Sequence, residues 1–116
     1  MSQEIVFGKM IEMLANMEPD EPVKNVVSGN PQTTFNELVK GEGFESGVWS
    51  CSAGAFEINS YSINEVMLLV AGSMSLTDLA GKTVELKEGD MFFIPKGWSG
   101  TWTVHQDMQK MYVIMY

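Results

Sequence analysis

Hydrophobic residues in the second half of the chain occur in short runs, each closed by glycine, proline or a polar turn. Runs of this length, with turns every few residues, are typical of β-strands. The pattern predicts eight strands, over residues 47–52, 55–60, 65–71, 74–78, 83–86, 91–94, 100–105 and 110–115. The long helices that would connect a parallel sheet are not predicted between them, so this part of the chain indicates an all-β sandwich or barrel.

The first 45 residues follow a different pattern, with three of the four prolines and scattered charges. Their apolar positions fall roughly at helical spacing near the start, which predicts a short helix over about residues 8–17, although Gly8 weakens it. Residues 23–27 and 34–39 are each typical of a short strand.

The change in composition near residue 45 predicts two parts in a chain that has the length of one domain. We expect residues 1–45 to form an N-terminal arm and residues 46–116 to form a barrel. The arm is expected either to pack on its own barrel or to swap onto the barrel of a neighbouring chain. Small barrels tend to cover exposed edge strands, and symmetric pairing is the commonest way to do so. We therefore expect a homodimer.

The charge balance restricts the partners of the protein. Seven lysines and no arginine stand against 15 acidic residues, which gives a net charge of −8. Such a chain is repelled by phosphate backbones and by anionic lipid, so we expect neither a nucleic acid nor a membrane as a partner. The longest apolar run, residues 66–71, is too short to span a bilayer, and the first residues lack the basic region of a signal peptide. With Cys51 as the only cysteine, a disulfide within the chain is excluded, and these features together predict a cytoplasmic protein.

Glycine, proline and one carboxylate recur at a defined spacing. Residues Gly89 to Gly97 have the pattern G-D-x-x-x-x-P-x-G, and an earlier stretch runs from Gly54 to Gly72 with Glu65 seven residues before its end. Glycine permits the positive φ of tight turns, and proline removes a hydrogen-bond donor where strand pairing stops. The later stretch resembles the second conserved motif of the cupin superfamily, and the earlier stretch resembles the first.

Shorter segments make the resemblance narrower. They are similar to the small single-domain cupins related to the ureidoglycine aminohydrolase cupin domain and to the ethanolamine-utilisation cupin. The segments are residues 47–51, 53–56, 76–78, 97–102 and 110–112. The resemblance implies an RmlC-like jelly roll, which is a double-stranded β-barrel of two antiparallel sheets with a pocket at its wide end.

The resemblance also identifies the positions where other cupins hold a metal ion, with a His-x-His pair, a glutamate and a further histidine. In this sequence those positions are Asn59 and Tyr61 or, one residue later, Ser60 and Ser62, followed by Glu65 and Gly100. A tight site for iron, manganese or zinc needs three or four converging donors. One glutamate therefore predicts no tightly bound transition metal, and no other cofactor is expected.

Six residues are candidates for the pocket of such a barrel: Trp49, Tyr61, Glu65, Met67, Trp102 and Tyr112. Glu65 is the candidate catalytic residue, as a general acid or base, or alternatively the anchor of a ligand amine. No cation is expected beside it, because the chain has no arginine and nothing in the sequence brings Lys110 to the pocket. A structural role stays equally open for Glu65, and core packing is the favoured alternative for Tyr61 and Trp102.

Three functions are compatible with the sequence. The first is the binding of a small polar metabolite, which the absence of the metal-binding histidines favours. The second is a small hydrolase or isomerase that acts on a ureido, amino or sugar metabolite with Glu65 as its acid or base. The third is a structural or regulatory subunit whose barrel serves mainly for dimerisation. The sequence does not identify the ligand.

Overall fold

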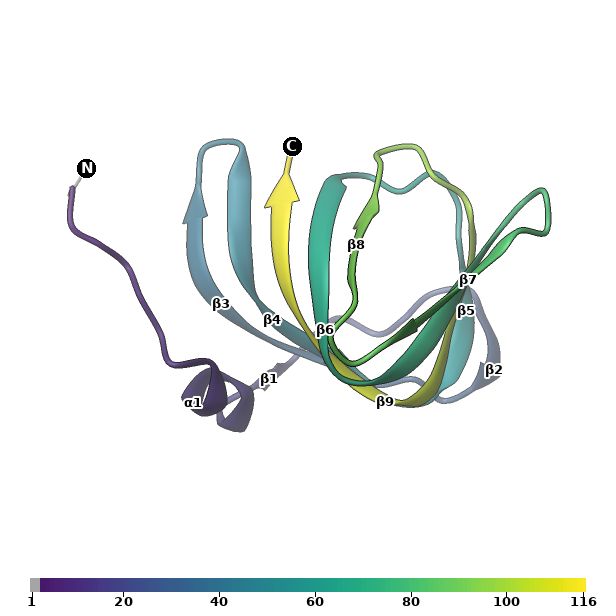
Figure 1. Cartoon of the computed structure of the whole chain (residues 1–116), viewed down its shortest axis with the longest axis horizontal. Helices are drawn as coiled ribbons and strands as arrows, with labels where there is room; N and C mark the ends of the chain where they lie inside the picture. Colours follow the sequence, from purple (N-terminus) through teal and green to yellow (C-terminus); the bar gives the residue numbers. More distant parts are fainter. Residues whose placement is uncertain (1–2) are drawn as a thin grey trace.

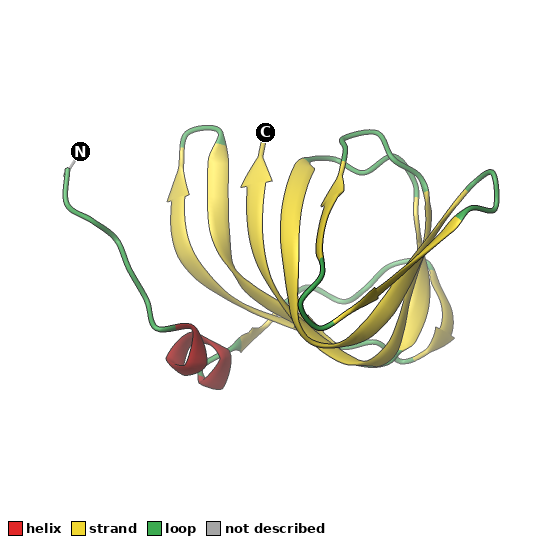
Figure 2. Ribbon diagram, in the orientation of Figure 1, coloured by secondary structure: helices red, strands yellow, loops and turns green. Residues whose placement is uncertain are grey.

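The computed structural model describes residues 3–116, which contain one short helix and nine strands (Figure 2). The elements are α1 (Met10–Ala15), β1 (Glu18–Pro19), β2 (Val26–Gly29), β3 (Thr33–Gly41), β4 (Phe44–Cys51), β5 (Gly54–Ile58), β6 (Asn64–Asp78), β7 (Thr83–Lys87), β8 (Met91–Ile94) and β9 (Gly100–Met115). Within the described part of the chain, the single helix is far too short to cross a membrane.

Two long antiparallel strands, β6 and β9, organise the barrel, because each takes part in both of its sheets (Figure 1). The first part of β6 and the last part of β9 lie in one sheet, with strand order β1-β3-β4-β9-β6-β8. The last part of β6 and the first part of β9 lie in the other, with order β2-β5-β9-β6-β7. Every strand pair is antiparallel, and the two sheets curl toward each other as in a cupin jelly roll.

Strand β6 joins two strands that the sequence predicted as separate, over residues 65–71 and 74–78. The pairing register with β9 shifts between Leu69 and Met74, and Gly72 lies in this bulge with a φ of 83°. A side chain at Gly72 would place its Cβ 2.2 Å from the carbonyl oxygen of Asp107. One inserted residue exchanges the two faces of a strand, so both Leu69 before the bulge and Met74 after it are buried.

Strand β9 likewise joins the predicted strands 100–105 and 110–115. His105 is an exposed residue within this strand. Alternate residues of β9 face inward, from Trp102 and Val104 to Met108, Lys110 and Tyr112, and all five are buried.

Residues assigned to the N-terminal arm contribute to the sheets. β3 pairs along its whole length with β4, and β2 pairs with β5. The predicted helix is shorter than expected, at Met10–Ala15, and the side-chain amide of Asn36 on β3 donates a 3.1 Å hydrogen bond to the Met13 carbonyl. Residues before this helix extend away from the barrel, with Ile5 88% and Phe7 80% exposed (Figure 1).

The hydrophobic core fills the space between the two sheets. Its buried residues come mainly from the inward faces of β6 and β9, and include Met67, Leu69, Met74, Trp102 and Met108. Partly buried aromatic residues, among them Trp49 and Tyr61, pack against this cluster at one side. The core therefore ends at a cavity instead of continuing to the surface of the barrel.

Candidate ligand-binding pocket

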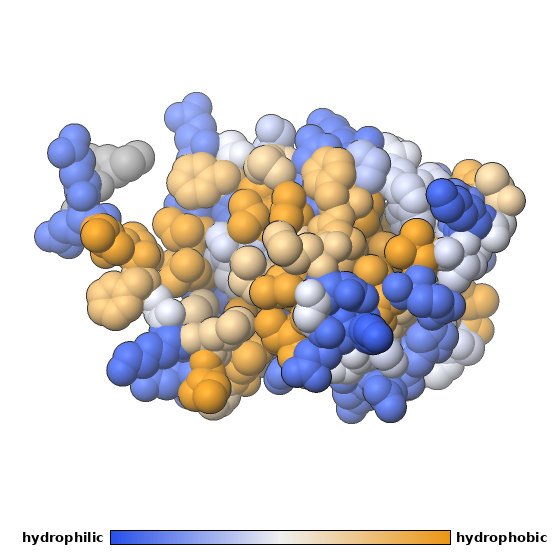
Figure 3. Space-filling model, in the orientation of Figure 1, coloured by the Kyte–Doolittle hydropathy of each residue, from blue (hydrophilic) through white to orange (hydrophobic). Residues whose placement is uncertain are grey.

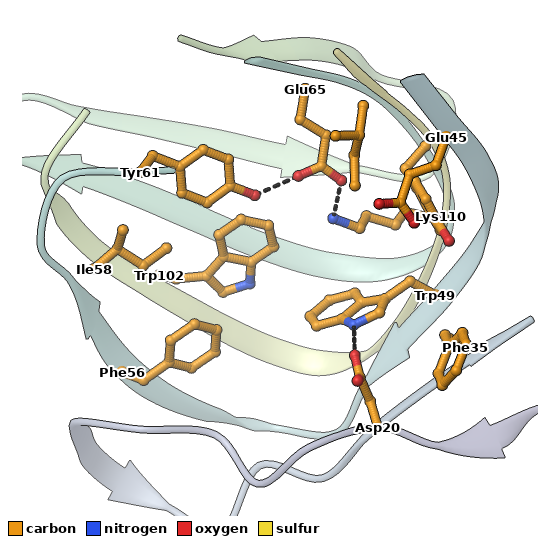
Figure 4. Close-up of a pocket in the computed structure, with 12 residues that line it drawn as sticks. Asp20, Phe35, Glu45, Trp49, Phe56, Ile58, Tyr61, Glu65, Trp102 and Lys110 are labelled. Atoms are coloured by element: carbon orange, nitrogen blue, oxygen red, sulfur yellow. Dashed lines mark hydrogen bonds and ion pairs between the residues drawn. The ribbon is translucent and has the colours of Figure 1, made fainter. Parts of the chain in front are cut away.

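A cavity of about 450 Å³ opens between the two sheets (Figure 4). Its lining residues come from both sheets, from the loop after β5 and from the segment next to β1. They are Asp20, Phe35, Glu45, Trp49, Phe56, Ile58, Tyr61, Glu65, Trp102, Lys110, Tyr112 and Ile114. The volume is within the range of sites for small molecules, and the lining combines aromatic walls with a few polar groups, as such sites usually do.

An ion pair lies at the most buried side of the cavity. The Lys110 ammonium is 2.8 Å from Oε2 of Glu65, and both side chains are only 4% exposed. Strand pairing brings them together, because Glu65 on β6 pairs with Ile114 and Leu69 with Lys110, and both side chains face inward. The expectation that Glu65 has no cation beside it is therefore wrong: Lys110 neutralises it.

The second oxygen of Glu65 is also occupied. The Tyr61 hydroxyl donates a short hydrogen bond to Oε1 of Glu65 (Figure 4). The loop that carries Tyr61 is fixed by two 2.7 Å backbone hydrogen bonds, from the Tyr61 amide to the Trp98 carbonyl and from the Gly97 amide to the Tyr61 carbonyl. Burial, and then the neighbouring Glu65 carboxylate, raise the pKa of Tyr61 strongly, so this hydroxyl keeps its proton and acts as a donor.

Aromatic rings form the walls of the cavity. Trp102 stacks on Phe56, with ring centroids 5.8 Å apart, and meets Trp49 in a T-shaped arrangement at 5.9 Å. The Lys110 ammonium lies over the Trp49 ring, 4.5 Å from its centroid. The Trp49 indole nitrogen donates a 3.3 Å hydrogen bond to Oδ2 of Asp20, which ties the exposed edge of the cavity to the segment next to β1. These contacts hold the rings in place before any ligand binds.

Tyr112 completes the wall between Lys110 and β4. A Cβ at Gly47, the residue paired with Tyr112, would be 2.9 Å from the Tyr112 hydroxyl and 2.4 Å from the Asn36 carbonyl oxygen. A glycine at position 47 therefore leaves room for the phenol. Burial, with added contributions from Glu45 and other carboxylates nearby, raises the pKa of Tyr112 to about 12.

The structure brings together five of the six residues that sequence analysis proposed for the pocket: Trp49, Tyr61, Glu65, Trp102 and Tyr112. Met67 does not line the cavity, because it is fully buried behind it, with its sulfur 3.1 Å from the Lys110 ammonium. Sequence reasoning missed Lys110, although its position two residues before Tyr112 on one strand places both on the same face. It also missed Asp20 and Glu45, which nothing in the local pattern connects with the barrel interior.

A family model for the EutQ-like cupin domain matches residues 38–112. The chain belongs to the EutQ-like cupin family. Among curated proteins, no sequence matches this cupin significantly.

Solved structures agree with the assignment. A DUF861-family protein of unknown function from Pseudomonas syringae pv. tomato superposes with a TM-score of 0.81 at 25% identity, over 89% of this cupin and 46% of that chain. The cupin thus spans less than half the length of that relative. The EutQ protein of Clostridium difficile gives a TM-score of 0.65 at 18% identity, over 73% of this chain and 68% of that one. The polyketide cyclase RemF from Streptomyces resistomycificus gives a TM-score of 0.66 at 19% identity, over 87% of this chain and 75% of that one. At 18% and 19% identity, the likeness to EutQ and to RemF shows a common fold alone.

The residues of this cupin do not fit a transition metal. Of the positions that match the metal ligands of other cupins, only Glu65 carries a good donor, and both of its oxygens accept hydrogen bonds from Tyr61 and Lys110. A metal ion at this place would stand beside the Lys110 ammonium, which repels it. Within residues 3–116, no three side chains of His, Cys, Asp or Glu come together in a group that could hold a metal ion.

Two other reactive side chains lie outside the cavity. Cys51 is buried in the core, and burial raises the pKa of its thiol to about 11, so the thiol is protonated at neutral pH and is a poor nucleophile. His105 lies on the outer surface, where its Nε2 is 3.2 Å from the Ser75 hydroxyl and 3.7 Å from a Glu85 carboxylate oxygen. Neither residue lines the pocket.

Proposed function

We propose that this cupin domain binds a small polar metabolite with an apolar body in the cavity between its two sheets. The observation that carries the proposal is a cavity of about 450 Å³ with rigid aromatic walls, next to a buried and fully paired polar group. The rings of Trp49, Phe56 and Trp102 give the cavity an apolar lining (Figure 4). Preformed walls lower the entropy cost of binding.

The charges around the cavity favour an uncharged or amine-bearing ligand. Three carboxylates line it, those of Asp20, Glu45 and Glu65, against the single ammonium of Lys110. Because Lys110 pairs with Glu65, the charges of Asp20 and Glu45 at the more exposed edge are not balanced by a lining cation. An anionic ligand would be repelled by these two groups and by the net charge of −8.

Binding is favoured over acid–base catalysis by the state of Glu65. A general base must present its acceptor oxygen to the substrate proton without strong competition from donors of the protein. Both oxygens of Glu65 already accept hydrogen bonds from donors of the protein, Tyr61 and Lys110. A ligand amine would compete with the buried Lys110 ammonium for this carboxylate.

A small enzyme is the alternative, and one observation favours it. Tyr61, Glu65 and Lys110 form a continuous chain of hydrogen bonds along the cavity wall, which could relay a proton to a bound hydrolase or isomerase substrate. Of the relatives described above, RemF bears the name of an enzyme.

The likeness to the ureidoglycine aminohydrolase cupin, the homodimer and the cytoplasmic location also stay predictions.

A thermal-shift screen with neutral, cationic and anionic metabolites tests the proposal. Neutral and amine-bearing compounds are expected to raise the melting temperature, because a ligand that binds only the folded state stabilises it. The variant Ile58→Trp, which puts a larger side chain into the cavity, should abolish the shift, whereas Val84→Trp outside the cavity should retain it. Compounds recovered unchanged after incubation support binding, and converted compounds support the enzyme. Shifts that Ile58→Trp does not alter would contradict the location of the site.

A further inference from the structure

The indole nitrogen of Trp102 is a buried donor without an acceptor. The Trp102 side chain is 2% exposed, and Nε1 has no hydrogen-bond partner. In the described part of the chain, no other buried side-chain nitrogen or oxygen lacks one. Native structures rarely leave such a group unpaired, because it loses its hydrogen bond to water without replacement.

This donor lies at the cavity. Trp102 lines the pocket from β9, and its buried indole nitrogen points toward the side where Trp49 and Phe56 lie (Figure 4). The Trp49 ring meets it in a T-shaped arrangement, but an aromatic face is a much weaker acceptor than an oxygen. The Trp49 nitrogen differs, because it donates to Asp20.

No oxygen of the described residues accepts a hydrogen bond from this nitrogen. The Glu65 oxygens accept hydrogen bonds from Tyr61 and Lys110. The Lys110 ammonium carries only donors, directed to Glu65 and to the sulfur of Met67 and placed over the Trp49 ring. The Tyr61 and Lys110 donors are thus directed to protein acceptors, which leaves the Trp102 nitrogen as the donor without one. Its complement is a molecule that supplies the acceptor.

We propose that the ligand presents an uncharged acceptor oxygen, as in a ketone, amide, ether or alcohol, to Nε1 of Trp102, with its apolar body against Trp49 and Phe56. The inference rests on the proposed function and names the chemical class that the same site takes. A carboxylate or phosphate is the wrong acceptor, because Asp20 and Glu45 repel it at the more exposed edge.

Nuclear magnetic resonance of the wild-type protein tests this directly. The three tryptophans give three indole N–H signals, which Trp49→Phe and Trp98→Phe assign, leaving that of Trp102 by elimination. Trp98 lines a different cavity and is the internal control. The probes are acetophenone and ethylbenzene, which differ by one carbonyl oxygen, and benzoate, which carries an anionic acceptor.

Acetophenone is expected to shift the Trp102 indole N–H downfield, to leave Trp98 unchanged and to bind about tenfold more tightly than ethylbenzene. Benzoate is expected to bind more weakly than acetophenone.

If both neutral probes shift the Trp49 signal equally and the Trp102 signal stays unmoved, the pocket binds small molecules but the inference is overturned. A long-lived water that remains on the Trp102 N–H with acetophenone bound also overturns it, as does benzoate binding most tightly. If no probe moves a pocket signal, the result contradicts the proposed function as well.

Discussion

Glu65 and Lys110 form one buried ion pair across two adjacent strands, with 2.8 Å between the ammonium and Oε2. The pair separates the aromatic cavity from the core, since the sulfur of Met67 contacts the ammonium from the core side. Each group depends on the other, because an unpaired charge at this depth is costly.

Removing one partner should therefore destabilise the fold. We expect Glu65→Gln and Lys110→Met each to lower the free energy of unfolding by about 3–5 kcal/mol, because each leaves a buried charge unpaired. The double variant should be more stable than the sum of the two losses predicts. Urea denaturation of the wild type, the two single variants and the double variant measures the four free energies of unfolding. If the single variants stay within about 1 kcal/mol of wild type and their effects add, the two side chains are not coupled.

The bulge in β6 gives a second prediction. Gly72→Ala should lower the free energy of unfolding by about 4 kcal/mol or more. The new Cβ would overlap the Asp107 carbonyl, and the alanine would have to adopt the positive φ of this position. Gly81→Ala is the matched control, since Gly81 has a similar φ of 88° but open space around it, and should cost only about 1–2 kcal/mol. Equal losses in chemical denaturation would mean that the bulge tolerates a side chain.

Stability should fall in alkaline solution. Burial raises the pKa of Cys51 from 9.0 to about 11 and that of Tyr112 from 10.0 to about 12. The unfolded chain therefore loses these protons first, so the stabilisation is complete below about pH 9 and is lost as the pH rises through 11 and 12. Denaturation of wild type and Cys51→Ala across this range checks it, and the variant should lose less stability between pH 9 and 11. An identical slope in both would exclude Cys51 as a cause.

The sequence predicted the all-β class and the strand positions well, because strand and turn signals are local. It could not show that residues 65–71 and 74–78 form one strand, since the glycine between them marks a bulge as readily as a turn. Among the predicted pocket residues, Trp102 and Tyr112 both line the cavity from β9. Lys110 was missed because its partner, Glu65, is 45 residues away in sequence and only the strand register brings them together.

The exposed apolar arm supports the expectation of a homodimer. Ile5 and Phe7 lie before α1 with most of their surface exposed, and Met91 and Phe93 on β8 are exposed apolar residues of the barrel itself. Figure 3 shows apolar side chains gathered on one face of the molecule. Apolar surface of this kind usually marks an interface. We expect a dimer mass by light scattering at micromolar concentration, and a shift toward monomer in the double variant Ile5→Ser, Phe7→Ser. A wild-type monomer would contradict the prediction, and Leu79→Ser, on an exposed turn, is the control.

The capture of a metabolite from a cell extract tests the central claim most directly. Wild-type protein and the variants Ile58→Trp and Val84→Trp are incubated with a small-molecule extract, separated by size exclusion and denatured, and the released compounds are identified by mass spectrometry. We predict that wild type and Val84→Trp retain the same uncharged or amine-bearing compound, small enough for a cavity of about 450 Å³, and that Ile58→Trp loses it. Wild-type protein that retains no compound, or a compound that Ile58→Trp retains equally well, would contradict the assignment of this cavity as a ligand-binding site.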